Sequence, residues 1–192
     1  MRKAFQTLED RDIHNVESNG PFICNNKHAW LGNGYYFWDS FIDNAHWWGK
    51  EVTKYRNGYI ICEANYLLDE KRCFNLVDNP EHLTQFNQTK NILISEGLYK
   101  QNVTTVARVI KFIKEKIGIF NYEAIRAYGV NSINPVSTFS KRTIFQYRED
   151  KMSFQYLDSV PAIQICFFTK KSLDLNRFRI IFPVEYIDDY LV

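Results

Sequence analysis

The sequence predicts an α+β domain in which a few helices flank a mainly antiparallel β-sheet. Short strand-like runs with a few helical segments interspersed among them favour this fold class. The length of 192 residues suits one domain, and no glycine-, proline- or serine-rich linker divides it. We therefore expect residues 1–192 to fold as a single domain.

The first third of the chain is expected to contain three strands and two helices. The strands are rich in aromatic and β-branched residues and span residues 4–8, 35–38 and 59–66. Asp10 opens a helix that ends at Gly20. Ser40 and Asp43 have the spacing of a capping box, which predicts a second short helix over about 41–49.

The remaining elements follow from turn residues and periodicity. Asn79 and Pro80 are typical of a helix start, and Gly97 of a helix end. Apolar residues recur at steps of three and four over 102–118, which predicts an amphipathic helix whose lysines and arginine form a solvated face. Two further strands are expected over residues 162–168 and 178–182.

Charge and cysteine usage narrow the class of protein. A formal charge of +2 gives no general attraction to nucleic acid or to an anionic membrane. The amino terminus has no apolar signal core, and no apolar run is long enough to span a bilayer. The four cysteines lack paired spacing and are interpreted as free thiols in a reducing compartment. We expect a cytoplasmic protein without a metal site or a membrane partner.

The segment over residues 30–39 has the composition of a site for a flat ring. Its glycines permit a tight turn and a close approach of the backbone to a ligand. The strand that follows places Tyr36 and Trp38 on one face, and a short helix then brings Trp47 or Trp48 back beside it. An aromatic wall beside an open backbone edge suits a ring such as nicotinamide.

This segment resembles the G-x-G-x-Y-F-x-D motif of the poly(ADP-ribose) polymerase and diphtheria-toxin branch of the ADP-ribosyltransferases. The positions that fall on the motif are Gly32, Gly34, Tyr36, Phe37 and Asp39. Ala45 matches an alanine six residues past the aspartate, and Trp47 matches the aromatic residue that stacks on nicotinamide. The resemblance implies a split antiparallel β-sheet that binds NAD as substrate, with Gly34 and Tyr36 beside the ring.

The other two motifs of that family are altered in this chain. Gln6 and Thr7 occupy the places of a histidine and a glycine on the first strand, although His14 is an alternative to Gln6. The amide of Gln6 can make the same kind of hydrogen bond to ribose, and Thr7 retains its backbone groups. Gln164 lies where the family has a glutamate. The resemblance thus implies that Tyr36, Gln164 and Gln6 form the catalytic set.

Two functions follow from this resemblance. One is a mono-ADP-ribosyltransferase that uses NAD and transfers ADP-ribose to a protein or nucleic-acid acceptor, with Arg126 holding the pyrophosphate or pairing with Glu123. Glu63 or Glu123 could then replace the missing carboxylate. The other is a catalytically inactive module that binds NAD, ADP-ribose or a protein partner. An unrelated alternative is a hydrolase that pairs Cys24 with His28 or His46.

Overall fold

A computed structural model describes residues 1–25, 29–101, 104–118, 120–129, 144–146 and 156–187. The strands are β1 (Arg2–Glu9), β2 (Tyr35–Asp39), β3 (Tyr59–Tyr66), β4 (Cys73–Asn75), β5 (Ala124–Tyr128), β6 (Ile144–Gln146), β7 (Tyr156–Asp158), β8 (Ile163–Phe167) and β9 (Asn176–Phe182). The α-helices are α1 (Ile13–Asn19), α2 (Ile42–Trp47), α3 (Pro80–Ser95) and α4 (Val106–Phe112). Short π-helical turns, Trp48–Thr53 and Ile113–Ile117, extend α2 and α4, and 3-10 turns cover Ser172–Asp174 and Val184–Tyr186.

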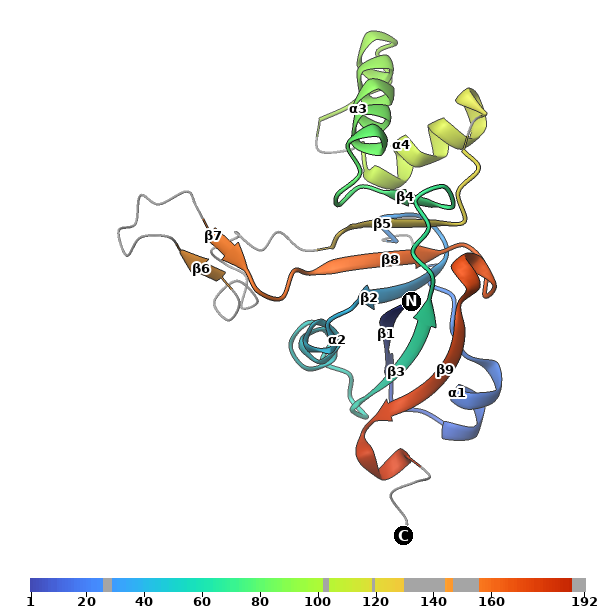
Figure 1. Cartoon of the computed structure of the whole chain (residues 1–192), viewed down its shortest axis with the longest axis vertical. Helices are drawn as coiled ribbons and strands as arrows, with labels where there is room; N and C mark the ends of the chain where they lie inside the picture. The colour runs from blue at the N-terminus through green and yellow to red at the C-terminus, as the bar shows by residue number, and fades with distance from the viewer. Residues whose placement is uncertain (26–28, 102–103, 119, 130–143, 147–155, 188–192) are drawn as a thin grey trace.

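Seven strands form one sheet in the order β4-β5-β8-β2-β1-β3-β9 (Figure 1). All neighbouring pairs are antiparallel except β4 with β5. Strands β6 and β7 form a separate antiparallel pair that lies beyond one end of β8 (Figure 1). The prediction of helices combined with a largely antiparallel sheet is confirmed.

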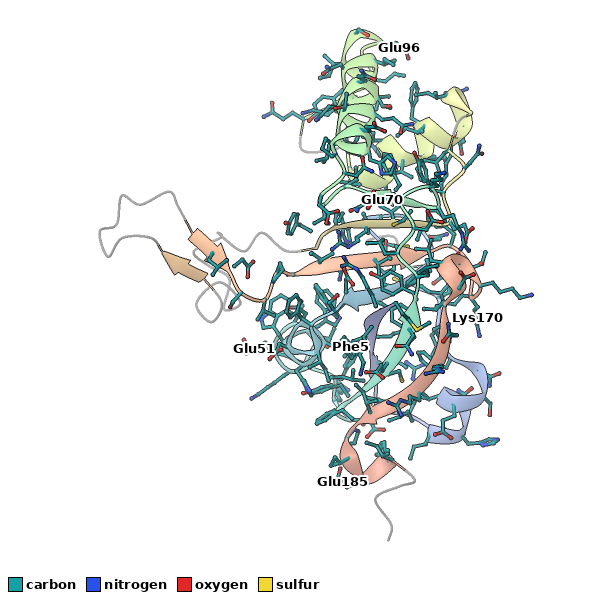
Figure 2. All side chains as sticks on the ribbon, viewed as in Figure 1. Phe5, Glu51, Glu70, Glu96, Lys170 and Glu185 are labelled. Atoms are coloured by element: carbon teal, nitrogen blue, oxygen red, sulfur yellow. The ribbon has the colours of Figure 1, made fainter. Side chains whose placement is uncertain are left out.

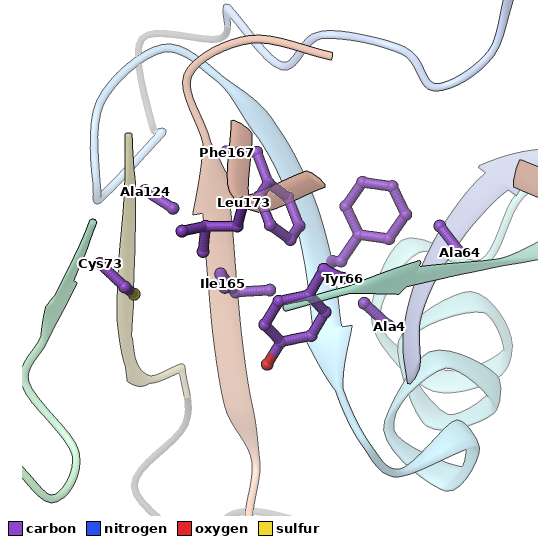
Figure 3. Close-up of a cluster of buried hydrophobic side chains, with 9 residues drawn as sticks. Ala4, Ala64, Tyr66, Cys73, Ala124, Ile165, Phe167 and Leu173 are labelled. Carbon is purple, nitrogen blue, oxygen red and sulfur yellow. The ribbon is translucent and has the colours of Figure 1, made fainter. Parts of the chain in front are cut away.

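Alternation along the central strands divides the core between the two faces of the sheet. One face carries a buried cluster that includes Ala4, Tyr66 and Leu173 (Figure 3), and Phe37 belongs to the same cluster. Helix α1 covers the neighbouring part of this face through Val16. The opposite face is covered by three helices. There α2 packs against β1, β2 and β3, while α3 and α4 pack against β5 and β8. Figure 2 shows side chains filling the space between β1 and α2, where Phe5 is labelled.

The boundaries of the helices correct parts of the sequence-based prediction. Asn79 caps α3 as expected, because its side chain accepts hydrogen bonds from the next backbone amides. Ser40 does not cap α2, however, since its backbone has a φ of 67° and its hydroxyl donates to Asp39. Helix α4 starts after its cap Thr105, later than expected, while residues 102–103 lie outside the described part of the chain.

Candidate functional site

The sheet is nearly divided in two between β1 and β2. Strand β1 pairs with β3 over all eight of its residues, but with β2 only at Ala4–Asp39 and Phe5–Trp38. We call these two pairs the seam, and the strand sets β4-β5-β8-β2 and β1-β3-β9 the two half-sheets. Beyond the seam the strands separate, so the next hydrogen-bonded pair of the ladder, Thr7 opposite Tyr36, is absent from the register.

The separation of the strands leaves one edge of β1 open. The amide of Ser40 donates to the carbonyl of Lys3 at 2.9 Å, so the backbone groups of Lys3 point toward β2. In an antiparallel strand every second residue points the same way, which directs the N–H and C=O of Thr7 to the edge that β2 has left. The side chain of Thr7 is anchored elsewhere, because its hydroxyl donates to the carbonyl of Ala45 at 2.9 Å. A backbone donor and a backbone acceptor therefore lie side by side at an open edge.

A cleft of about 570 Å³ lies beside this edge, within the usual size range of ligand pockets, about 300–1,000 Å³. Three consecutive residues of β1 line it, although consecutive residues of a strand point to opposite faces. This is possible only because the cleft follows the open edge of the strand. Among the residues that the structure describes, the lining comprises Gln6, Thr7, Leu8, Arg11, Phe22, Ile23, Cys24, Ala29, Trp30, Tyr36, Phe37, Trp38, Trp48, Thr53, Tyr55 and Gln164.

The cleft is rich in aromatic rings and poor in charge. Seven of the lining residues named above are aromatic: Phe22, Trp30, Tyr36, Phe37, Trp38, Trp48 and Tyr55. Among the described residues that line the cleft, Arg11 alone is charged, and none is an aspartate, glutamate or histidine. Arg11 is exposed, and its guanidinium carbon lies 5.1 Å from the centroid of the Phe22 ring. The site is therefore suited to a flat ligand with an anionic group near Arg11.

Tyr36 contributes its ring to the cleft and its hydroxyl to the preceding turn. The hydroxyl accepts a hydrogen bond from the amide of Leu31 and donates one to the carbonyl of Gly32, both at 2.8 Å. Burial raises the pKa of Tyr36 far above its ordinary value, so the phenol stays protonated. Tyr36 thus lines the cleft, and its hydroxyl holds the backbone of the turn.

Gln6 also reaches the cleft, but its amide is bonded to the main chain. Its oxygen accepts from the amide of Phe22 at 3.0 Å, and its nitrogen donates to the carbonyl of Phe22 at 2.9 Å. A longer contact of 3.4 Å joins the same nitrogen to the carbonyl of Tyr36. Gln6 therefore replaces the missing backbone pairing beyond the seam and clamps the Phe22 wall of the cleft to β1.

Gln164 lies on β8, in the half-sheet β4-β5-β8-β2, where its partner in the β2–β8 register is Trp38. Its side-chain oxygen accepts from the indole Nε1 of Trp30 at 2.7 Å. The residue is 9% exposed and lines the cleft, as does Trp30. Gln6, Thr7, Tyr36 and Gln164, four residues predicted from the sequence, are thus brought to one cleft.

Trp47 was predicted to stack on a ligand, but the structure does not place it among the residues that line the cleft. Trp47 is 7% exposed and lies in the core, with its ring edge-on to Trp38 at a centroid distance of 6.2 Å. Successive residues of a helix differ in direction by about 100°, so its neighbour Trp48 faces the cleft instead. Trp30 and Arg11 are lining residues that sequence reasoning did not assign to the site, and Trp48 was considered there only as an alternative to Trp47. The repeated Trp-Trp pair was the signal for Trp48.

Gly34 does not line the cleft, contrary to the prediction that its backbone contacts a ligand. It forms a two-way bridge with Cys24, with N···O distances of 2.8 and 3.2 Å. A Cβ at this position would lie 2.5 Å from Cys166 Sγ and 2.6 Å from the carbonyl oxygen of Phe167. The glycine is required for close packing of this loop against β8.

Arg126 was predicted to hold a pyrophosphate, and this prediction is wrong. Arg126 lies on the face of β5 opposite the cleft and is 3% exposed. Its Nε donates to Asp39 at 2.8 Å, and its Nη1 donates to Asn75 and Asp78, both at 3.2 Å. Arg126 also does not pair with Glu123, which binds Arg72 at 2.7 Å. The guanidinium is a buried structural cation.

The alternative catalytic residues do not reach the cleft either. Glu63 forms ion pairs with Lys3 and Arg179 on the outer strands of its half-sheet, and neither it nor Glu123 is among the lining residues. His14 is exposed on α1 and also lies away from the lining. His46 Nδ1 contacts the hydroxyl of Tyr59 at 3.0 Å, so it is not paired with Cys24, and His28 lies outside the described residues. These positions give no support to a hydrolase.

Comparison with known proteins gives no further assignment. No family model matches the chain, and no curated protein or solved structure matches it. Within the described residues, no helix is long and apolar enough to cross a membrane, and no group of three potential ligands is placed to bind a metal ion. The function therefore has to be argued from the cleft itself.

Proposed function

We propose that the cleft beside the seam binds NAD, with its nicotinamide end at the open edge of β1. The observation that carries this proposal is the exposed N–H and C=O of Thr7 next to an aromatic-lined cleft. A primary carboxamide has one acceptor oxygen and one donor nitrogen, so it can pair with both backbone groups of a single strand residue. The aromatic side chains of Trp38, Trp48 and Tyr36 offer the apolar walls that the ring requires.

The charges of the cleft agree with a dinucleotide. Its one charged lining residue among those described, Arg11, is a cation that suits phosphate oxygens, and it takes the role that the sequence had suggested for Arg126. A near-neutral inner cleft with a cation at its rim matches a ligand whose ring is apolar and whose pyrophosphate is anionic. The split sheet beside the cleft also supports an ADP-ribosyltransferase-like fold, which we include in the proposal.

Binding is supported better than rapid chemistry. Cleavage of NAD creates a positive charge on the ribose, and a nearby carboxylate would stabilise it in the transition state. Gln164 is neutral, and removing a comparable electrostatic group typically costs about 10²–10³ in rate. The side-chain amide of Gln6, moreover, is hydrogen-bonded to the backbone of Phe22. We therefore propose an NAD-binding module with slow turnover at most.

The second candidate is the mono-ADP-ribosyltransferase that the sequence suggests. The convergence of Gln6, Tyr36 and Gln164 on one cleft favours it. Labelled NAD incubated with the protein and a mixture of protein and nucleic-acid acceptors would give a labelled product, together with free nicotinamide. If nicotinamide is released at the same rate with and without the protein, the transferase is refuted and the binding module is the remaining function.

Calorimetry and thermal unfolding with NAD test the proposal. At a hundredfold excess over Kd a ligand stabilises the folded state by about 2.7 kcal/mol, which for a chain of this size raises Tm by about 5–10 °C. Trp48→Ala should weaken binding at least tenfold, since a buried ring contact is lost. Tyr99→Ala, a half-buried aromatic residue outside the lining, is the matched control. Millimolar NAD that produces neither heat nor a change in Tm would refute the proposal.

A further inference from the structure

The hydrogen bond between Trp30 and Gln164 fixes which end of the glutamine amide points where. An indole N–H can only donate, so the atom of Gln164 that it contacts at 2.7 Å must be the oxygen. The amide nitrogen, with its two hydrogens, is therefore on the opposite branch of the side chain. Unlike most buried amides, this one has its orientation set by the chemistry of its neighbour.

Gly129 holds the same side chain from behind. A Cβ on Gly129 would lie 2.8 Å from Cγ and 2.9 Å from Cδ of Gln164, closer than real Cβ contacts come. The backbone here is held in place, because the amide of Gly129 donates to the carbonyl of Ala162 at 2.7 Å. Gln164 is thus confined between the glycine backbone and the indole, with little freedom to rotate.

The amide nitrogen of Gln164 is left without a partner. No hydrogen bond from Nε2 to any residue in the described ranges is found, although the side chain is more than nine-tenths buried. The nitrogen is not among the fully enclosed polar atoms that lack a partner in the described part of the chain, so it is open to the cleft. Because Gln164 lines the cleft, a molecule bound there can supply the missing acceptor.

We propose that Gln164, held by Trp30 and Gly129, is a recognition site for an oxygen acceptor on the ligand. Gln164 Nε2 donates to a hydroxyl or carbonyl oxygen, and Trp30 is a positioning residue that acts through Gln164. This inference rests on the proposed NAD binding, and it specifies that the group bound at this point must accept a hydrogen bond. A carboxylate at position 164 would keep the bond from Trp30 and lose the donor.

Three variants and their combination test this arrangement by calorimetry with NAD. Gln164→Leu should weaken binding about 3- to 10-fold, the equivalent of one hydrogen bond. Gln164→Glu should weaken it further, because a carboxylate then faces an acceptor oxygen. Trp30→Phe should also weaken binding, but it should have no additional effect in the Gln164→Leu background. Gln88→Glu, an exposed residue of α3, is the control for the added charge.

Each failure has a different signature. Wild-type protein that does not bind NAD refutes the proposed function, whereas NAD binding that is unchanged in Gln164→Leu and Gln164→Glu refutes the recognition site alone. Additive effects of Trp30→Phe and Gln164→Leu would show that Trp30 does not act through Gln164. A ligand-free measurement is also decisive: the indole N–H resonance of Trp30 should shift and exchange faster in Gln164→Leu. An unchanged resonance would overturn the geometry.

Discussion

Replacing Gln6 with methionine separates a structural role from a ligand-binding role at the centre of the cleft. The two side chains have similar length and volume, so the change removes the amide and leaves the packing nearly intact. In the structure the amide of Gln6 makes two short hydrogen bonds to the backbone of Phe22. Gln6→Met therefore leaves one backbone donor and one backbone acceptor without their partner.

The expected loss of stability follows from these two bonds. A buried polar group left unpaired costs about 1–3 kcal/mol, and Phe22 is only half-buried, so water will reach part of it. We therefore expect the free energy of unfolding to fall by about 2–3 kcal/mol. For a chain of this length, that corresponds to a decrease in Tm of about 4–12 °C.

Denaturant and thermal unfolding without ligand measure this loss, with Gln88→Met on the exposed face of α3 as control. Calorimetry with NAD on the folded variant then reports the ligand-binding role. If Gln6 acts as a clamp, the loss appears in the ligand-free protein. A variant as stable as wild type that binds NAD much more weakly would show that Gln6 contacts the ligand, and the clamp would have to be abandoned.

Three further predictions concern residues around the cleft and the core. Arg126→Met should lower the free energy of unfolding by up to about 3–5 kcal/mol, because the buried Asp39 carboxylate loses its buried cation and keeps only the partly exposed Arg2 as an ion-pair partner. The Kd for NAD measured on folded protein should stay unchanged. Gly34→Ala should lower the free energy of unfolding by about 1–3 kcal/mol through overpacking, and it should also weaken NAD binding. The control Gly58→Ala has open space around its Cβ but a φ of +86°, so it should lower the free energy of unfolding by about 1–2 kcal/mol and leave NAD binding intact. Burial lowers the pKa of His82 and of His46 below the ordinary value, so the unfolded chain binds more protons and the free energy of unfolding should fall as the pH decreases below about 6.5. NMR titration of both rings together with urea unfolding at pH 7.5 and 5.5 checks this, and equal stability at the two values would contradict it.

The parts of the fold that could be predicted are those whose signal is local. Strands β1, β2, β3 and β8 are dense in aromatic and β-branched residues, and Asn79 with Pro80 is a helix start that depends on its own side chain. Strand β4 was not predicted because it has only three residues. Strand β5 was not predicted because it is short and carries a buried cation, Arg126, whose partner Asp39 is 87 residues away. A charged residue in a short segment indicates a loop unless its buried partner is known.

The residues of the candidate site differ in the same way between those with a local sequence signal and those that depend on distant partners. Tyr36 and Gln164 could be placed because alternation along a strand fixes their face. Trp47 was chosen over Trp48 because it falls on the aromatic position of the motif, whereas Trp48 lines the cleft. The rotation of a short helix cannot be determined from sequence to within one residue. Trp30 was missed because it reaches the cleft from a loop 134 residues away from Gln164. Only the folded chain brings that indole to that amide.

The short seam has a mechanical consequence. Because two residue pairs join the half-sheets along the β1–β2 ladder, a small rotation of one half-sheet about the seam would produce a larger displacement at the far end of the cleft. Helices α3 and α4 pack against one half-sheet and α1 against the other, while α2 packs against both. A molecule that forms hydrogen bonds to Thr7 on one half-sheet and to Gln164 on the other would fix the angle between the two half-sheets. Occupancy of the cleft would then be transmitted to the outer surfaces of these helices, where another protein could sense it.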